Sequence, residues 1–264
     1  MIPPHEYRRL VMAVTGRSPA QLAADGELDG DARRRVEELA TRREAGEPLQ
    51  YLEGTVSFGP IELAVDGRAL IPRPETEGLW EEAVRSLGDA GPGTAILDLC
   101  TGSGNLALAL KHAFGPAQVY ATEVSEKALT LAEENAARLG LDVSFLHGDL
   151  YEPVPKRLMG RFDLIVANPP YVSETEYAAL PDEIRLHEPR EALVAGPEGT
   201  EVLAAIADEA FWWVGVGGWV ICEIGETQGE RALELFGAFD REVRRDMAGK
   251  DRFLVARKGA SCCL

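Results

Sequence analysis

The sequence predicts an α/β fold, in which a mostly parallel sheet carries helices on both faces and follows a small helical module. From Thr94 onward, short apolar runs of strand length alternate with longer runs of helical periodicity, joined by short connections. The first fifty residues show only helical patterns. The 264 residues, 45% hydrophobic and 27% charged, suit one large domain with a small companion and exclude a disordered, collagen-like or coiled-coil protein.

The N-terminal module is predicted to consist of short helices. Residues 6–14 carry apolar side chains at helical spacing, and Gly16 ends this run. Ser18 and Pro19 are typical of the N-cap and first position of a second helix. A further helix is expected over 31–45, stopped by Gly46.

A connector with β character follows the helices. Residues 55–58 and 61–65 read as two short strands around a Gly-Pro turn, so we expect a hairpin. Pro72 and Pro74 hold the next segment extended, and a helix is predicted over 76–87.

The remaining chain alternates strands and helices. The predicted strands are 95–99, 118–122, 143–147, 162–167 and 219–224, and the predicted helices are 105–114, 126–139, 200–214 and 228–239. The runs 241–247 and 252–257 are expected to pair as final antiparallel strands.

Charge and cysteine usage limit the possible partners. The chain carries 27 Lys and Arg against 44 Asp and Glu, a net charge of −17, so nucleic acid is repelled at long range and no direct nucleic-acid partner is expected. The four cysteines, Cys100, Cys222, Cys262 and Cys263, lack C-x-x-C spacing and are interpreted as reduced thiols. Cys262 and Cys263 have no assigned purpose.

We expect a soluble, cytoplasmic protein without a metal. The first residues lack the pattern of a secretory signal, and no stretch is long and apolar enough to span a bilayer, so no membrane partner is expected. No metal-ligand spacing links the four histidines, which are His5, His112, His147 and His187.

A glycine-bearing turn follows the strand 95–99. Gly102, Gly104 and Ala107 fit the dinucleotide-binding pattern G-x-G-x-x-G/A, in which the backbone approaches a ligand closely and the helix N–H groups face it. This signal is weak on its own, because a tight strand-to-helix turn without a ligand has the same appearance.

Two acidic residues strengthen the interpretation as a nucleotide site. Glu123 ends the next strand, 19 positions after Gly104, where a carboxylate can accept hydrogen bonds from both ribose hydroxyls of an adenosine ligand. Asp149 closes the following strand and could reach an adenine amino group, although it could equally start a loop. NAD and S-adenosylmethionine both satisfy these features.

The tetrapeptide Asn168-Pro169-Pro170-Tyr171 decides between the two cofactors. It follows the apolar strand 162–167, so it faces the crevice at the carboxyl ends of the strands. Asn and two prolines could simply make a stiff exit from the strand. In such a fold, however, this tetrapeptide is typical of methyltransferases that act on planar amide or amine nitrogens.

These segments together resemble the HemK/PrmC family, the protein-(glutamine-N5) methyltransferases of peptide chain release factors. The resemblance spans nearly the whole chain and rests on 48–52, 70–77, 98–104, 168–171, 187–189, 223–225 and 228–229. It implies an N-terminal helical substrate-docking domain (1–52), a β-hairpin linker (53–75) and a class I S-adenosylmethionine-dependent methyltransferase domain (76–264). Such a domain has a Rossmann-like, mostly parallel sheet of seven strands.

The resemblance also implies roles for named residues. S-adenosylmethionine would be bound by Cys100, Thr101, Gly102, Ser103, Gly104, Glu123, Asp149, Leu150 and Asn168. The substrate amide would be held by Asn168, Pro169, Pro170 and Tyr171, which are also the expected catalytic residues, with Arg73 and Glu75 beside the substrate.

Within that segment, the Asn168 side-chain oxygen and the Pro169 carbonyl would accept the two N–H bonds of the substrate glutamine. Pro170 would stiffen the loop and Tyr171 would pack on the amide plane. The family usually has Gly at Cys100, Asp at Glu123 and an aromatic residue at Leu150, and its N-terminal module is usually longer.

The implied activity is methylation of the glutamine in the Gly-Gly-Gln motif of a release factor by a monomeric enzyme. The alternative within the class is methylation of a glutamine in a ribosomal protein. Cys100, the run 168–172 and the nearby Leu180-Pro181 are similar to the sister group with that activity, whereas 71–75 favours the release-factor branch. A DNA adenine-N6 methyltransferase is disfavoured by the net charge of −17. A nicotinamide-dependent dehydrogenase and a non-catalytic relative that binds a release factor remain as different classes.

Overall fold

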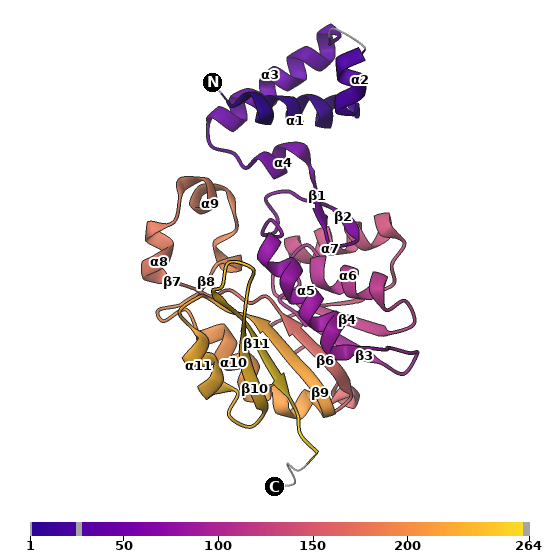
Figure 1. Ribbon diagram of the computed structural model, residues 1–264, viewed down its shortest axis with the longest axis vertical. Coiled ribbons are helices and arrows are strands. Elements are labelled where there is room, and N and C mark those ends of the chain that lie inside the picture. Colours follow the sequence, from indigo (N-terminus) through magenta and orange to yellow (C-terminus); the bar gives the residue numbers. More distant parts are fainter. Residues whose placement is uncertain (1, 25–27, 261–264) are drawn as a thin grey trace.

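Short helices at the N-terminal end are joined through a hairpin to a larger α/β unit (Figure 1). The computed structural model describes residues 2–24 and 28–260, so Cys262 and Cys263 lie outside the described residues. The N-terminal helices are α1 (Pro4–Thr15), α2 (Pro19–Ala24), α3 (Gly30–Glu44) and α4 (Leu49–Glu53). They enclose a small apolar core of Leu10, Val11, Val36, Leu49 and Leu52.

Local signals set the ends of these helices much as the sequence predicts. α1 begins with Pro4 in its first turn and ends at Gly16, whose φ of 65° is left-handed. Asp29 caps α3 by accepting a hydrogen bond from the N–H of Ala32. The helix α4 was not predicted, because five residues are too few to show helical periodicity.

The predicted hairpin is confirmed and packs on the α/β unit. It consists of β1 (Thr55–Phe58) and β2 (Ile61–Ala64), which pair antiparallel. Phe58, Ile61 and Leu63 are buried in the same apolar cluster as the helices of the larger unit. The linker is therefore part of the α/β core rather than a free tether.

One mixed sheet of seven strands organises the larger unit, as expected. Its order is β10-β11-β9-β6-β3-β4-β5. The strands are β3 (Ala95–Leu99), β4 (Gln118–Glu123), β5 (Ser144–His147), β6 (Phe162–Ala167), β9 (Val214–Glu223), β10 (Asp240–Arg245) and β11 (Asp251–Arg257). β3, β4, β5, β6 and β9 are parallel, and β11 pairs antiparallel with both β9 and β10.

Helices cover both faces of the sheet (Figure 1). The helices are α5 (Pro74–Leu87), α6 (Asn105–Ala113), α7 (Glu126–Leu139), α10 (Glu201–Trp213) and α11 (Gly229–Leu235). Ile96 of β3 packs with α5 and α6, whereas its neighbour Leu97 packs with α10 and α11. This double burial explains why the strand reads as an uninterrupted apolar run.

The segment between β6 and α10 contains elements that the sequence did not predict. They are β7 (Val172–Ser173), α8 (Glu174–Ala179), α9 (Asp182–His187), the 3-10 turn η2 (Arg190–Ala192) and β8 (Val194–Gly196). A further 3-10 turn, η1 (Lys156–Leu158), precedes β6. α9 reaches the N-terminal module, where Arg43 donates a 2.9 Å hydrogen bond to Glu183. β9 also begins at Val214, earlier than expected, and α11 ends at Leu235, before the buried Phe236 and Phe239.

Candidate active site

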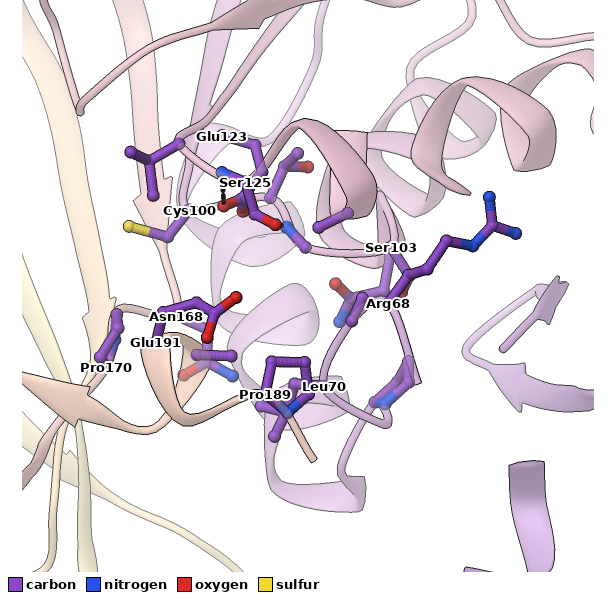
Figure 2. A pocket seen from close by; sticks show the side chains of 18 residues that line it. Arg68, Leu70, Cys100, Ser103, Glu123, Ser125, Asn168, Pro170, Pro189 and Glu191 are labelled. Atoms are coloured by element: carbon purple, nitrogen blue, oxygen red, sulfur yellow. Dashed lines mark hydrogen bonds between the residues drawn. The ribbon is translucent and has the colours of Figure 1, made fainter. Parts of the chain in front are cut away.

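A pocket opens at the carboxyl ends of β3, β4 and β6 (Figure 2). β3 lies between β4 and β6, so the connections that leave β3 and β6 diverge to opposite faces of the sheet and leave a crevice there. Of the residues expected at the site, the pocket wall contains Cys100, Thr101, Gly102, Ser103, Glu123, Asn168 and Pro170.

The structure adds wall residues that sequence reasoning did not assign. Leu70 and Pro72 come from the segment after the hairpin, and Pro189 and Glu191 come from the segment between α9 and β8. Leu70, Pro72 and Pro189 belong to stretches on which the family resemblance rested, which was the available signal, whereas Glu191 lies just outside them. Gly104, Asp149, Leu150, Pro169 and Tyr171 do not belong to this wall.

The turn after β3 is held by the buried carboxylate of Asp98. One of its oxygens accepts a 2.6 Å hydrogen bond from the Thr101 hydroxyl and a 3.1 Å bond from the N–H of Ala107, whereas Oδ1 has no partner among the described residues. Burial raises the pKa of Asp98 to about 7. Asp98 therefore fixes the loop from beneath rather than from the pocket side.

Gly104 supports the turn through its backbone shape. Its φ is 86°, and an added Cβ would lie 2.9 Å from Leu108 and 3.2 Å from Ala132. By contrast, Cys100 adopts φ 58° with a side chain, a conformation that costs a non-glycine residue energy. The thiol of Cys100 lines the pocket, and burial raises its pKa, so it is a neutral thiol at neutral pH.

Glu123 joins the end of β4 to the same turn. Its Oε2 accepts a 2.9 Å hydrogen bond from the N–H of Gly102, and its Oε1 accepts a 2.9 Å bond from the N–H of Ser125. Burial raises the pKa of this carboxyl despite these bonds. Each carboxylate oxygen has a second lone pair, so the group can still accept hydrogen bonds from a diol in the pocket.

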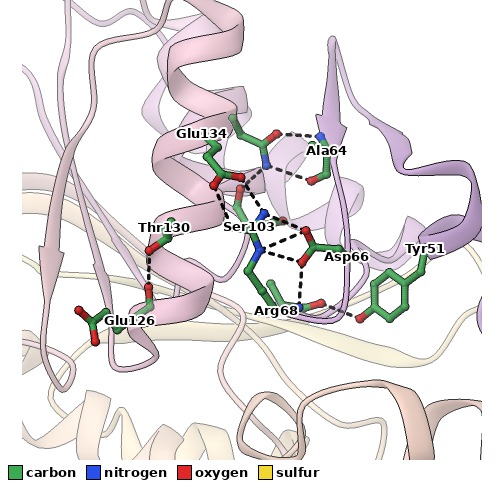
Figure 3. Close-up of polar contacts among 10 residues, drawn as sticks. Tyr51, Ala64, Asp66, Arg68, Ser103, Glu126, Thr130 and Glu134 are labelled. Carbon is green, nitrogen blue, oxygen red and sulfur yellow. Dashed lines mark hydrogen bonds and ion pairs between the residues drawn. The ribbon is translucent and has the colours of Figure 1, made fainter.

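The hairpin linker is pinned onto the pocket by polar contacts (Figure 3). Arg68, a wall residue, donates to Asp66 at 2.8 Å and to Glu134 of α7 at 2.9 Å. The side chain of Asn135 donates to the carbonyls of Ser103 and Ala64, at 3.0 and 3.1 Å. The linker, α7 and the glycine turn are thereby fixed relative to one another.

The Asn168 side chain is oriented by a residue of α5. Its Nδ2 donates a 3.0 Å hydrogen bond to Oγ1 of Thr76, so the amide oxygen is the end left for a ligand in the pocket. The Tyr171 hydroxyl instead donates a 3.2 Å bond to Glu223, and burial beside that carboxylate raises the pKa of Tyr171.

Arg73 and Glu75 occupy different places. Arg73 forms an ion pair with Glu188, whose carboxylate is almost fully buried, and Glu188 also accepts a 3.4 Å hydrogen bond from the N–H of Ile71. This pair ties together the two segments that carry Leu70 and Pro189. Glu75 lines a separate hollow between α5 and the β10–β11 hairpin.

The described part of the chain contains neither a metal-binding cluster nor a membrane-spanning helix. Among residues 2–24 and 28–260, no three side chains of His, Cys, Asp or Glu are grouped so as to hold a metal ion. In the same part of the chain, no helix has the length and apolar character needed to cross a membrane.

Comparison with known proteins yields consistent relatives. Residues 2–54 match the PrmC N-terminal domain, and residues 84–197 match the methyltransferase small domain. The release factor glutamine methyltransferase of Deinococcus radiodurans is 40% identical over 260 residues, which cover 97% of this chain and 91% of that protein. The protein of the same name from Geobacter sulfurreducens is 40% identical over 224 residues, covering 84% of this chain and 77% of that one.

A solved structure supports the fold. The crystal structure of a methyltransferase from Pyrococcus furiosus superposes with a TM-score of 0.55 at 20% sequence identity, covering 87% of this chain and 98% of that one. At this identity the likeness concerns the fold alone. It agrees with the class I methyltransferase architecture expected from the sequence.

Proposed function

The chain belongs to the family of release factor glutamine methyltransferases, and we propose that it methylates the glutamine side chain (N5) in the Gly-Gly-Gln motif of a peptide chain release factor. It is an enzyme that uses S-adenosylmethionine, which excludes the nicotinamide-dependent dehydrogenase. The observation that carries the proposal is the Asn168 side chain, which lies in the pocket wall with its nitrogen engaged by Thr76.

The pocket residues fit S-adenosylmethionine. The carboxylate of Glu123 lies at the end of β4 in the pocket wall, where its free lone pairs suit the two ribose hydroxyls of an adenosine group. The turn that contains Gly102 brings backbone close to the same space. When bound, this cofactor supplies an electrophilic methyl group on a sulfonium sulfur.

Position and electrostatics are what the protein contributes to the reaction. A carboxamide nitrogen is a poor nucleophile because its lone pair is delocalised into the carbonyl. The Asn168 side-chain oxygen and the Pro169 carbonyl are proposed to accept the two N–H bonds of the glutamine, which aims its nitrogen at the methyl group. Two oxygen acceptors also favour the positive charge that develops on that nitrogen. No base is needed before attack, since the nitrogen becomes acidic only as the new bond forms.

The walls of the pocket are suited to excluding water. Leu70, Pro72, Pro170 and Pro189 place apolar groups around the polar ones. Pro170 is proposed to stiffen the loop that carries Asn168. The role expected for Tyr171, packing on the amide plane, stays a prediction, as do the substrate contacts of Arg73 and Glu75.

Methyl transfer from labelled S-adenosylmethionine to a recombinant release factor tests the proposal, with a Gly-Gly-Gln to Gly-Gly-Ala variant as control. Label on the first protein and not on the second is expected. Label on a ribosomal protein instead would identify the alternative acceptor. Binding of the release factor without transfer to any acceptor would identify a non-catalytic relative.

The remaining properties of the protein are predictions. We expect a monomer in the cytoplasm that contacts neither nucleic acid nor membrane. The domain boundaries 1–52, 53–75 and 76–264 are likewise proposed from the family resemblance.

A further inference from the structure

We propose that Thr76 and Glu223 are positioning residues that fix which end of the Asn168 side-chain amide faces the substrate. The inference rests on the proposed function, because it concerns the oxygen that would accept the glutamine N–H bond. The three side chains form one hydrogen-bonded series. Asn168 Nδ2 donates to Thr76 Oγ1 at 3.0 Å, and Thr76 Oγ1 donates to Glu223 Oε2 at 2.8 Å.

The fold brings these residues together from three separate elements. Glu223 ends β9, which pairs parallel with β6, and Asn168 directly follows β6. Thr76 lies in the first turn of α5, and its neighbour Glu75 points to a different hollow. Thr76 is fully buried and Glu223 is 1% exposed, so water does not compete for their hydrogen bonds.

The chemistry of the groups gives the series a direction. An amide nitrogen only donates, and a carboxylate only accepts. The Thr76 hydroxyl must therefore accept from Asn168 and give its own hydrogen to Glu223. If the Asn168 amide turned over, its oxygen would face a hydroxyl oxygen whose hydrogen is already committed, and that contact would repel.

The direction matters for the substrate as much as for the protein. With Nδ2 held by Thr76, the Asn168 oxygen is left for the pocket and can accept an N–H bond from the glutamine. With the amide reversed, its NH2 group would meet the NH2 group of the substrate, and two donors cannot bond to each other. Loss of the series should therefore reduce turnover without changing cofactor binding.

The protonation state of Glu223 controls the direction of the hydrogen bonds among Glu223, Thr76 and Asn168. Burial raises the pKa of Glu223 to about 7, although Thr76, Arg252 and Tyr171 each favour the ionised form; Glu75 opposes it. A protonated Glu223 can donate to Thr76, which then can donate to the Asn168 oxygen. Protonation thus permits the reversed amide, and turnover should fall as the pH drops below about 7.

The test compares Thr76→Val with two other variants. Thr76→Ser keeps the hydroxyl, and Glu223→Gln keeps the shape of the side chain but can either accept a hydrogen bond from Thr76 or donate one to it. One lost hydrogen bond in a buried site corresponds to a fall in kcat of about 10- to 100-fold. We expect that fall for Thr76→Val, with an unchanged dissociation constant for S-adenosylmethionine, and near-normal kcat for Thr76→Ser. Thr76→Val and Glu223→Gln should also lose the decline of kcat at acidic pH.

A second readout is independent of the acceptor protein. The side-chain NH2 signals of Asn168, followed by 15N NMR, should show slow hydrogen exchange in the original protein and in Thr76→Ser, and fast exchange in Thr76→Val. Equal kcat and equal exchange in the two Thr76 variants would overturn the proposal, as would an acid decline that persists in Glu223→Gln. If Thr76→Val does not fold, Glu223→Gln decides the question. Failure of the original protein to methylate a release factor would instead count against the proposed function. The hydrogen exchange of the Asn168 side chain would then still test whether Thr76 and Glu223 hold its amide.

Discussion

The backbone N–H of Gly102 donates a 2.9 Å hydrogen bond to the side-chain oxygen Oε2 of Glu123. The glycine turn after β3 and the carboxylate at the end of β4 are thus held as one unit, although 21 positions separate the two residues. A family resemblance names both residues as cofactor ligands. The structure adds that the Gly102 N–H positions the Glu123 carboxylate.

Glu123→Gln should weaken the binding of S-adenosylmethionine. The amide loses the charge that strengthens hydrogen bonds with the ribose hydroxyls and can accept through only one of its two ends. We expect the dissociation constant to rise by about tenfold, equivalent to about 1.4 kcal/mol, measured by calorimetry. Glu126→Gln, on the exposed first turn of α7, is the matched control and should bind normally. Equal affinity of both variants would remove Glu123 from the cofactor site.

Arg73→Met should destabilise the fold far more than a comparable change at the surface. It leaves the Glu188 carboxylate, whose side chain is 1% exposed, without its cation. The expected loss in the free energy of unfolding is about 3–5 kcal/mol, measured by urea denaturation. Arg190→Met breaks the exposed pair with Glu174 and should cost about 1 kcal/mol or less. Similar losses for the two variants would show that the Arg73–Glu188 pair does not hold the linker to the pocket.

The stability of the fold should depend on pH through Glu223. Its pKa is about 7 in the folded protein and 4.5 as the ordinary value, so the folded state binds the proton more tightly than the unfolded state. This contribution to stability is present below about pH 4.5 and is lost as the pH rises through about 7. Asp98, with a pKa raised from 3.8 to about 7, acts in the same direction.

Glu223→Gln removes one of these two contributions. The gain in stability of the variant over the original protein should therefore be larger at pH 8 than at pH 5. Urea denaturation at both pH values measures the difference, and Glu230→Gln, on the exposed first turn of α11, serves as control. An identical difference at the two pH values would mean that Glu223 titrates alike in the folded and unfolded states.

Long, regular elements could be predicted from the sequence. β3, α7 and β6 have the bounds expected, because each has an apolar pattern bounded by a glycine, proline or polar turn. The elements α4, α8 and α9 are five or six residues long, and the last two contain several charged residues. They therefore show no apolar pattern from which a helical period could be recognised. Their place is decided by tertiary contacts such as that between Arg43 and Glu183.

The candidate site, too, could be predicted from the sequence only in part. Glu123 and Asn168 could be predicted because Glu123 ends β4 and Asn168 directly follows β6, and both strands end at the crevice. The contact of Asn168 with Thr76 joins residues 92 positions apart, and that of Thr76 with Glu223 joins residues 147 positions apart. Only the folded chain brings such residues together. The motif around Thr76 predicted substrate contacts for Arg73 and Glu75, whereas the structure shows that the Thr76 hydroxyl contacts Asn168.

Asn168 is proposed to present an oxygen to a glutamine amide that receives the methyl group. Mass spectrometry of the Gly-Gly-Gln peptide, after incubation of a release factor with S-adenosylmethionine and the enzyme, tests it most directly. We predict one added methyl group on that glutamine with the original protein and almost none with Asn168→Ala, which should still bind the cofactor. An unmodified glutamine with the original protein, or full methylation with Asn168→Ala, would contradict it.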